Sequence, residues 1–131
     1  MAIEVRTFVD TDVLIDVARK LPRAVDFWRR YEARSKMTCS VISLFELLAG
    51  CRNLQEQRAT VRSLATVDII QIESGDSIEA FGWYRTYHLS RGVGFLDCLI
   101  AAAARRLDCT VHTLNIKHFQ SIPGLKVVAP Y

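Results

Sequence analysis

The fold is decided by the stretch Ile3-Glu4-Val5-Arg6-Thr7-Phe8-Val9-Asp10-Thr11-Asp12-Val13-Leu14-Ile15-Asp16-Val17-Ala18. Its first seven residues are rich in β-branched and aromatic side chains and partly alternate in polarity, which predicts a β-strand over 3–9. From residue 13 onward the apolar residues take up helical spacing, which predicts a helix over 13–18. The chain therefore passes from a strand almost directly into a helix.

The same alternation of strand and helix continues to the end of the chain. Further helices are expected over residues 24–33, 43–49, 55–65, 75–90 and 95–107, and further strands over residues 37–39, 67–72, 110–114 and 125–128. Buried strands separated by helices predict an α/β fold, with a central, mostly parallel sheet and helices on both faces.

Local signals refine this pattern. Pro22 is expected to stop the first helix, and the helix over 24–33 is expected to pair with it as a helical hairpin. Strand 67–72 looks too apolar for an exposed edge of the sheet. Ser74 is expected to cap the helix over 75–90, whose apolar residues include Ile78, Phe81 and Tyr84.

Composition sets the broad class of the protein. The 131 residues are 50% hydrophobic and 24% charged, with a formal net charge of +3, which matches a globular protein and excludes a disordered one. This length favours one domain over residues 1–131. The four cysteines show no metal-binding spacing and are expected to be buried thiols. The longest apolar run is far shorter than a membrane span, and no secretory leader is recognised, so we expect a cytoplasmic protein.

Acidic residues stand where a parallel sheet exposes its ligand-binding edge, just after the ends of strands. Asp10 follows the first strand directly, and Asp12 comes two residues later. One of these aspartates could instead cap the following helix, a role that we assign more readily to Asp12 than to Asp10. Asp10 is therefore the first candidate site residue.

Three further candidates each have a structural alternative. Glu46 projects away from the apolar stripe of its helix, but Ser43 and Glu46 also fit a capping box, and their spacing favours neither interpretation. Asp97 lies in the first turn of the helix over 95–107, where the helix dipole favours its charge. Asn115 follows the strand over 110–114; its carbonyl oxygen can ligate a hard cation, although asparagine is also common in turns.

A family resemblance across nearly the whole chain joins these residues. Phe8 to Asp16 resembles the opening motif of PIN-domain nucleases, and Ser40 to Leu47 resembles the approach to their glutamate. Asp97 to Ala104 is similar to the Asp-x-Leu-Ile-Ala-Ala helix of the family. Thr113 to Phe119 and Ile122 to Leu125 resemble the closing segments of VapC-type toxins.

The resemblance implies a single PIN domain acting as a Mg²⁺-dependent endoribonuclease, the toxin of a type II toxin–antitoxin pair. It implies catalytic roles for Asp10, Glu46, Asp97 and Asn115, with Asp10 and Asp97 as direct ligands of Mg²⁺ or, as a substitute, Mn²⁺. Oxygen ligands suit such hard cations. Two departures, Asn115 and His118 at positions where many relatives carry acids, leave open whether one or two cations bind.

The resemblance also implies partners. The substrate is RNA of unspecified sequence, and a cognate VapB-like antitoxin is expected to lay a helix along an apolar groove near the first helices, lined by Phe27 and Trp28. A homodimer is expected, with Phe81 and Trp83 as contact residues, which could form a heterotetramer or a larger complex with the antitoxin. No membrane association is expected.

Two other functions compete with this interpretation. Asp10 and Asp12 would suit a haloacid-dehalogenase-like phosphatase that forms an aspartyl-phosphate on Asp10. Such an enzyme also needs a lysine and an acidic pair late in the chain, and here only Lys117 fits. The other alternative is a non-catalytic RNA-binding PIN module, against which the retained acids argue.

Overall fold

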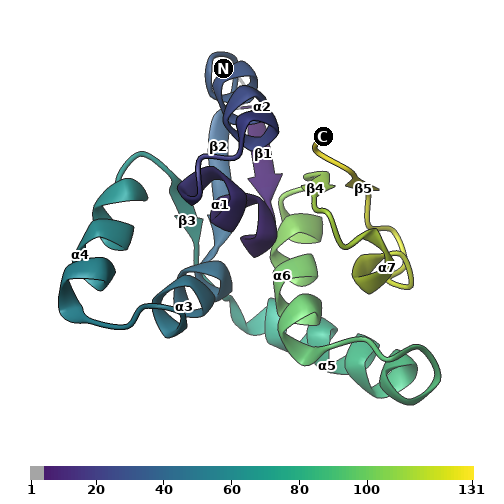
Figure 1. The fold of residues 1–131 in the computed structure, drawn as a ribbon. Coiled ribbons are helices and arrows are strands. Elements are labelled where there is room, and N and C mark those ends of the chain that lie inside the picture. The colour runs from purple at the N-terminus through teal and green to yellow at the C-terminus, as the bar shows by residue number, and fades with distance from the viewer. Residues whose placement is uncertain (1–4) are drawn as a thin grey trace.

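The computed structural model describes residues 5–131, which contain one sheet of five parallel strands in the order β3-β2-β1-β4-β5 (Figure 1). The strands are β1 (Arg6–Val9), β2 (Lys36–Ser40), β3 (Asp68–Ile70), β4 (Val111–His112) and β5 (Val127–Val128). Each strand runs parallel to its neighbours. The predicted α/β fold with a parallel sheet is confirmed.

Helices connect the strands and cover the sheet. Their bounds are α1 (Thr11–Ala18), α2 (Pro22–Glu32), α3 (Val41–Ala49), α4 (Leu54–Ser63), α5 (Ser74–Arg91), α6 (Phe95–Arg106) and α7 (Ile116–Phe119). The short helix α7 lies between β4 and β5, where no helix was predicted. None of the helices within residues 5–131 is both long enough and apolar enough to cross a bilayer.

Two apolar cores lie on opposite faces of the sheet, because successive side chains of a strand point to opposite sides. Val9 packs with Phe27 of α2 on one face. Phe8 packs on the other face with Trp83 of α5 and with the alanine run 101–104 of α6. The small alanine side chains let α6 lie close to the sheet, so its first turn is held at a fixed place beside the carboxyl end of β1.

The first strand and helix differ from prediction only at their ends. Residues 3 and 4 of the predicted strand lie outside the described residues, and α1 begins two residues earlier than expected, at Thr11. Pro22 does not stop α1. The helix ends at Ala18, the turn passes through Lys20 with a left-handed φ of 60°, and Pro22 begins α2, where its missing N–H leaves no helical hydrogen bond unmade.

The prediction that the strand over 67–72 lies inside the sheet is wrong, because β3 is an edge strand. Ile69 and Ile70 are nevertheless half-buried, one against each core, because helices cover both faces even at the edge. An apolar strand is buried wherever helices cover its two faces. Apolar composition therefore does not show that a strand lies in the centre of a sheet.

Helix α5 also corrects two expectations. Its N-cap is Glu73, not Ser74, and Glu73 forms a capping box with Asp76. Ile78 and Phe81 are exposed, whereas Trp83 is buried in the core. Trp83 therefore cannot provide the dimer contact that the sequence suggested. The cysteines are free thiols throughout, but only Cys39 and Cys98 are buried, while Cys51 and Cys109 are half-buried.

Candidate functional site

A cavity of about 420 Å³ lies beyond the carboxyl end of β1, where α1, α3 and α6 converge (Figure 1). All four residues predicted for the site line it, namely Asp10, Glu46, Asp97 and Asn115. Asp12 and His118 line it as well. The four predicted residues come from four separate parts of the chain, so the fold alone brings them together. Their chemical roles remain predictions.

Asp10 is held at the rim of the sheet by two hydrogen bonds. It is the N-cap of α1, and its Oδ1 accepts from the backbone amide of Thr11 at 2.8 Å. Its Oδ2 accepts from the hydroxyl of Thr113 at 2.8 Å. The expectation that Asp12, more than Asp10, caps the helix is therefore wrong. Asp10 both caps α1 and lines the cavity, because α1 begins directly after the carboxyl end of β1, where the cavity lies.

Asp12 ties the first turn of α1 to the loop after β4. Its Oδ2 accepts from the amide of Leu114 at 2.9 Å and from Nδ2 of Asn115 at 3.0 Å. Its Oδ1 is buried and has no hydrogen-bond partner within residues 5–131. Buried carboxylate oxygens are rarely left unpaired. This atom can accept a hydrogen bond from water or contact a cation in the cavity.

Glu46 does not form a capping box. Helix α3 begins at Val41 and is capped by Ser40, whose Oγ accepts from the amide of Ile42 at 3.1 Å. Ser43 is therefore inside the helix and fully buried. Glu46 instead accepts a hydrogen bond at Oε1 from the hydroxyl of Thr11 at 2.7 Å. This contact directs the exposed glutamate toward the cavity.

Two threonines position the acids, and the sequence interpretation did not single them out. The hydroxyl of Thr11 lies between Ser43 Oγ, at 2.8 Å, and Glu46. Thr113 donates to Asp10, and its oxygen accepts from the amide of Asn115 at 3.0 Å. The available signal was a threonine within two residues of the end of each of two adjacent strands, β1 and β4.

Asp97 lies in the first turn of α6, as predicted. Its Oδ2 is 3.4 Å from Nδ1 of His118, so the histidine occupies the flank of the cavity where relatives were expected to carry an acid. Burial raises the pKa of Asp97, and the nearby charges of Glu46 and Asp12 raise it further, while His118 opposes them. The carboxylates therefore repel one another across one cavity.

Asp10 experiences the same repulsion. Burial, the charge of Asp12 and, more weakly, that of Asp97 raise the pKa of Asp10 to about 6, against the opposing hydrogen bonds from Thr113 and Thr11. A carboxylate that is buried beside other carboxylates costs folding free energy unless a proton or a cation offsets its charge.

The residues fit a hard divalent cation with few protein ligands. The donors are carboxylate and amide oxygens, the set that Mg²⁺ prefers. A bound cation would offset the charge repulsion that helps to raise the pKa of Asp10, and the Oδ1 of Asp12 has no hydrogen-bond partner in residues 5–131. Within the described residues, no three His, Cys, Asp or Glu side chains form a ready-made metal cage. This arrangement suits Mg²⁺, which commonly keeps several waters and binds one or two carboxylates.

We expect an unusual pH dependence of stability in the absence of divalent cations. Because the pKa of Asp10 is raised from 3.8 to about 6 on folding, its protonated form favours the folded state, and this contribution is lost as the pH rises from 4 through 6. Between pH 4 and pH 7 the wild type should lose roughly 2 kcal/mol of unfolding free energy relative to Asp10→Asn. Urea denaturation in EDTA measures this difference. A gap that is constant with pH would contradict it.

Comparisons with known proteins agree with this geometry. Residues 7–125 match the PIN domain family model. The chain is 32% identical over 123 residues to Ribonuclease VapC10 of Mycobacterium tuberculosis, covering 90% of this chain and 89% of the relative. It is 28% identical over 130 residues to Ribonuclease VapC1 of Rickettsia felis, covering 92% of each.

Solved structures share the fold over nearly the whole chain. A toxin–antitoxin complex from Klebsiella pneumoniae superposes with a TM-score of 0.78 at 26% identity, covering 95% of this chain and 98% of that one. VapBC2 from Rickettsia felis, bound to a promoter DNA fragment, has the same TM-score at 22% identity and the same coverage. With the family model matched over most of its length and its acids gathered in one cavity, this chain belongs to the PIN domain family.

Proposed function

We propose that this chain is a Mg²⁺-dependent endoribonuclease, a single PIN domain that acts in the cytoplasm as the toxin of a toxin–antitoxin pair. One observation carries the proposal: Asp10, Glu46, Asp97 and Asn115, from four separate parts of the chain, line a single cavity. The names of the relatives, which are ribonucleases, and of the structural neighbours, which are toxin–antitoxin complexes, support it.

Asp10 and Asp97 would hold the ion in this cavity, which Asp12 also lines. A Mg²⁺ ion bound there would supply positive charge that makes a water more acidic and stabilises charge on the phosphodiester. Glu46 uses Oε1 for its bond with Thr11, which leaves Oε2 to orient a water for attack. Asn115 commits Nδ2 to Asp12, so its Oδ1 is the amide atom that faces a ligand.

The mouth of the cavity also suits a single-stranded substrate. Phe95, at the start of α6, lines the cavity and leaves 58% of its surface exposed. An exposed aromatic ring beside a phosphodiester site can stack on an unpaired base, which is how proteins commonly hold single-stranded RNA. A base held on Phe95 would place the adjoining phosphate near the acids.

Cleavage of a single-stranded RNA by the purified chain tests this proposal. We expect hydrolysis with Mg²⁺ or Mn²⁺, none with EDTA, and products that carry 5′-phosphate and 3′-hydroxyl ends. RNA that is bound but never cut would favour a non-catalytic module. Hydrolysis of small phosphate monoesters with phosphorylation of Asp10 would favour the phosphatase, although Lys117, which that enzyme needs, does not line the cavity.

An apolar groove near the first helices supports an antitoxin partner. It has a volume of about 330 Å³, and α1, α2, α3 and the end of α4 line it with Leu14, Val17, Trp28, Leu47 and Leu64. Phe27, which the sequence suggested as a second lining residue, is fully buried in the core, whereas Trp28 does line the groove. We propose that an apolar face of an antitoxin helix binds there.

Expression of the chain without an antitoxin is expected to arrest bacterial growth, and Asp10→Ala should abolish the arrest.

Trp28→Glu should remain toxic but escape inhibition by the co-expressed cognate antitoxin, because a charge in the groove is costly to bury. Growth curves with and without the antitoxin measure both effects. Neutralisation of Trp28→Glu as efficient as that of the wild type would place the antitoxin elsewhere.

A homodimer is also part of the proposal. Ile78 and Phe81 of α5 are 74% and 66% exposed, and Phe81 borders a small apolar hollow with Tyr84 and Phe95. Such adjacent apolar side chains are typical of interfaces. Two chains meeting here could each bind one antitoxin, which gives a heterotetramer or a larger complex. Sedimentation of the wild type beside Phe81→Lys tests this, and identical monomeric behaviour would exclude it.

A further inference from the structure

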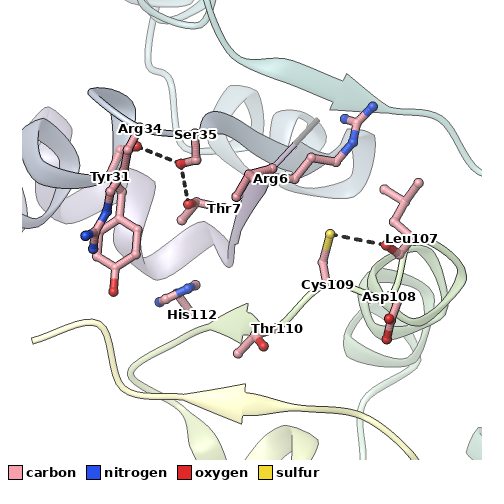
Figure 2. Close-up of a pocket in the computed structure, with 11 residues that line it drawn as sticks. Arg6, Thr7, Tyr31, Arg34, Ser35, Leu107, Asp108, Cys109, Thr110 and His112 are labelled. Atoms are coloured by element: carbon pink, nitrogen blue, oxygen red, sulfur yellow. Dashed lines mark hydrogen bonds between the residues drawn. The ribbon is translucent and has the colours of Figure 1, made fainter. Parts of the chain in front are cut away.

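A second cavity lies at the opposite edge of the sheet, where the strands begin. Figure 2 shows it between the end of α2, the start of β1 and the turn that precedes β4. Its volume is about 800 Å³, which is within the range of small-molecule sites. The proposed nuclease reaction uses none of its residues.

His112 of β4 carries a polar atom that the fold does not satisfy. The imidazole packs on the rings of Phe27 and Tyr31, with centroids 5.3 Å and 5.2 Å away. The residue is 9% exposed, and its Nδ1 is buried without a hydrogen-bond partner in residues 5–131. A neutral imidazole has one nitrogen as donor and the other as acceptor. His112 lines the cavity, so a ligand there can contact the ring.

The hydroxyl groups beside His112 have a fixed direction of donation. Ser35 Oγ donates to the carbonyl of Tyr31 at 2.6 Å, so Thr7 must donate its proton to Ser35, also at 2.6 Å (Figure 2). Thr7 Oγ1 is then left as an acceptor. Thr110 adds a further hydroxyl to the same wall. The wall therefore offers both donors and acceptors, as the edge of a nucleobase requires.

The rim of this cavity is positively charged. The guanidinium of Arg34 lies over the ring of Tyr31, 4.8 Å from its centroid, and Arg34 forms no ion pair with any residue that the structure describes. The acid on the rim, Asp108, is paired with Lys126 at 3.3 Å, and Arg6 is paired with Asp68. Arg34 is thus available to an anion, and arginine is well suited to phosphate.

These features exclude simpler occupants. A metal ion does not suit the rim, because the guanidinium of Arg34 repels cations. A phosphate alone would engage Arg34 but leave His112, Thr7 and the aromatic wall unused. The geometry points to a nucleoside monophosphate, free or as the terminal nucleotide of an RNA, with its phosphate on Arg34 and its base against His112 and Thr7.

Binding to the full chain, including residues 1–4, can be followed by NMR without divalent cations. The probes are the four ribonucleoside 5′-monophosphates, inorganic phosphate and a 5′-phosphorylated dinucleotide. At least one monophosphate should saturate the shifts of Tyr31, Arg34 and His112, and inorganic phosphate should bind far more weakly. Equal binding of the dinucleotide would assign an RNA end, and binding of the mononucleotide alone would assign a free nucleotide.

Two variants and one control make the test specific. Arg34→Ala should weaken binding about tenfold or more, as expected for loss of a charge-assisted contact. Arg30→Ala, which removes the same charge one turn earlier and outside the cavity, should change affinity by less than about twofold. His112→Phe keeps the aromatic packing and should abolish binding.

Failure of the nucleotide site can be distinguished from failure of the proposed nuclease activity. RNA cleavage by Arg34→Ala should equal that of the wild type, because Arg34 lines the cavity at the start of the strands and not the acidic cavity. The nucleotide site would be overturned by the absence of saturable shifts, by inorganic phosphate binding as tightly as the monophosphates, by shifts confined to the acidic cavity, or by unchanged affinity in both Arg34→Ala and His112→Phe.

Discussion

Asp97→Asn is expected to lower RNA cleavage on the order of 10³-fold, the size of effect seen when a preorganised charge contact to the transition state is removed. The variant should nevertheless fold normally. Burial and the charges of Glu46 and Asp12 raise the pKa of Asp97, which means that the ionised side chain destabilises the fold. A neutral asparagine removes this cost, and the cost is larger than the stabilisation lost with the exposed contact to His118. The unfolding free energy of the variant without metal should equal or exceed that of the wild type.

The matched control for this prediction is Asp108→Asn. Asp108 carries the same charge, its side chain is 88% exposed, and it lies in the turn before β4, away from the acidic cavity. We expect cleavage within about twofold of the wild type, because an exposed ion pair contributes little. Single-turnover cleavage rates and urea denaturation of both variants give the comparison. Full activity of Asp97→Asn would remove Asp97 from the site.

Asp76→Ala is expected to give the largest loss of stability, roughly 3 kcal/mol. Asp76 is 2% exposed, accepts from the amide of Glu73 at 3.0 Å, and pairs with Arg106 at 2.9 Å. Burial alone would raise the pKa of Asp76, but the bonds from Arg106 and Glu73 outweigh it and hold the pKa below its usual value. The substitution breaks the cap of α5 and its link to α6.

The control for Asp76→Ala lies one turn along α5. Glu79 forms an ion pair with Arg105 at the surface, and Glu79→Ala should cost less than about 1 kcal/mol. The difference between wild type and Asp76→Ala should shrink below about pH 4, because a lowered pKa stabilises only while the group is ionised. Equal effects of the two substitutions would mean that the buried pair contributes little.

Much of the fold could be predicted from local patterns. The strand that ends before Asp10 and the helix that begins before Asp97 both follow from apolar periodicity, and both are present. Position within the sheet could not be predicted, because an apolar strand such as β3 is buried by helices on its faces wherever it lies. The burial of Trp83 was also missed, since periodicity alone does not choose the packed face of α5.

The site was predictable in its residues and less so in its contacts. The acids were found because each follows a strand or opens a helix near the sheet edge, and because the family resemblance joined them. The bonds of Asp12 to Asn115 and of Thr113 to Asp10 each join residues 103 positions apart, so no local pattern contains them. The capping role was assigned to Asp12 instead of Asp10 because an aspartate at either position fits the local preference for helix N-caps.

The most direct test of a shared cation site is a titration of Mn²⁺ into the ¹⁵N-labelled full chain, followed by paramagnetic broadening of its amide signals. The site described above predicts that broadening begins at Asp10, Asp97 and Asn115 and reaches Arg34, beside the start of the strands, only at much higher Mn²⁺ concentrations. It also predicts that Asp97→Asn weakens this binding markedly. Broadening centred elsewhere, or broadening that Asp97→Asn leaves unchanged, would contradict it.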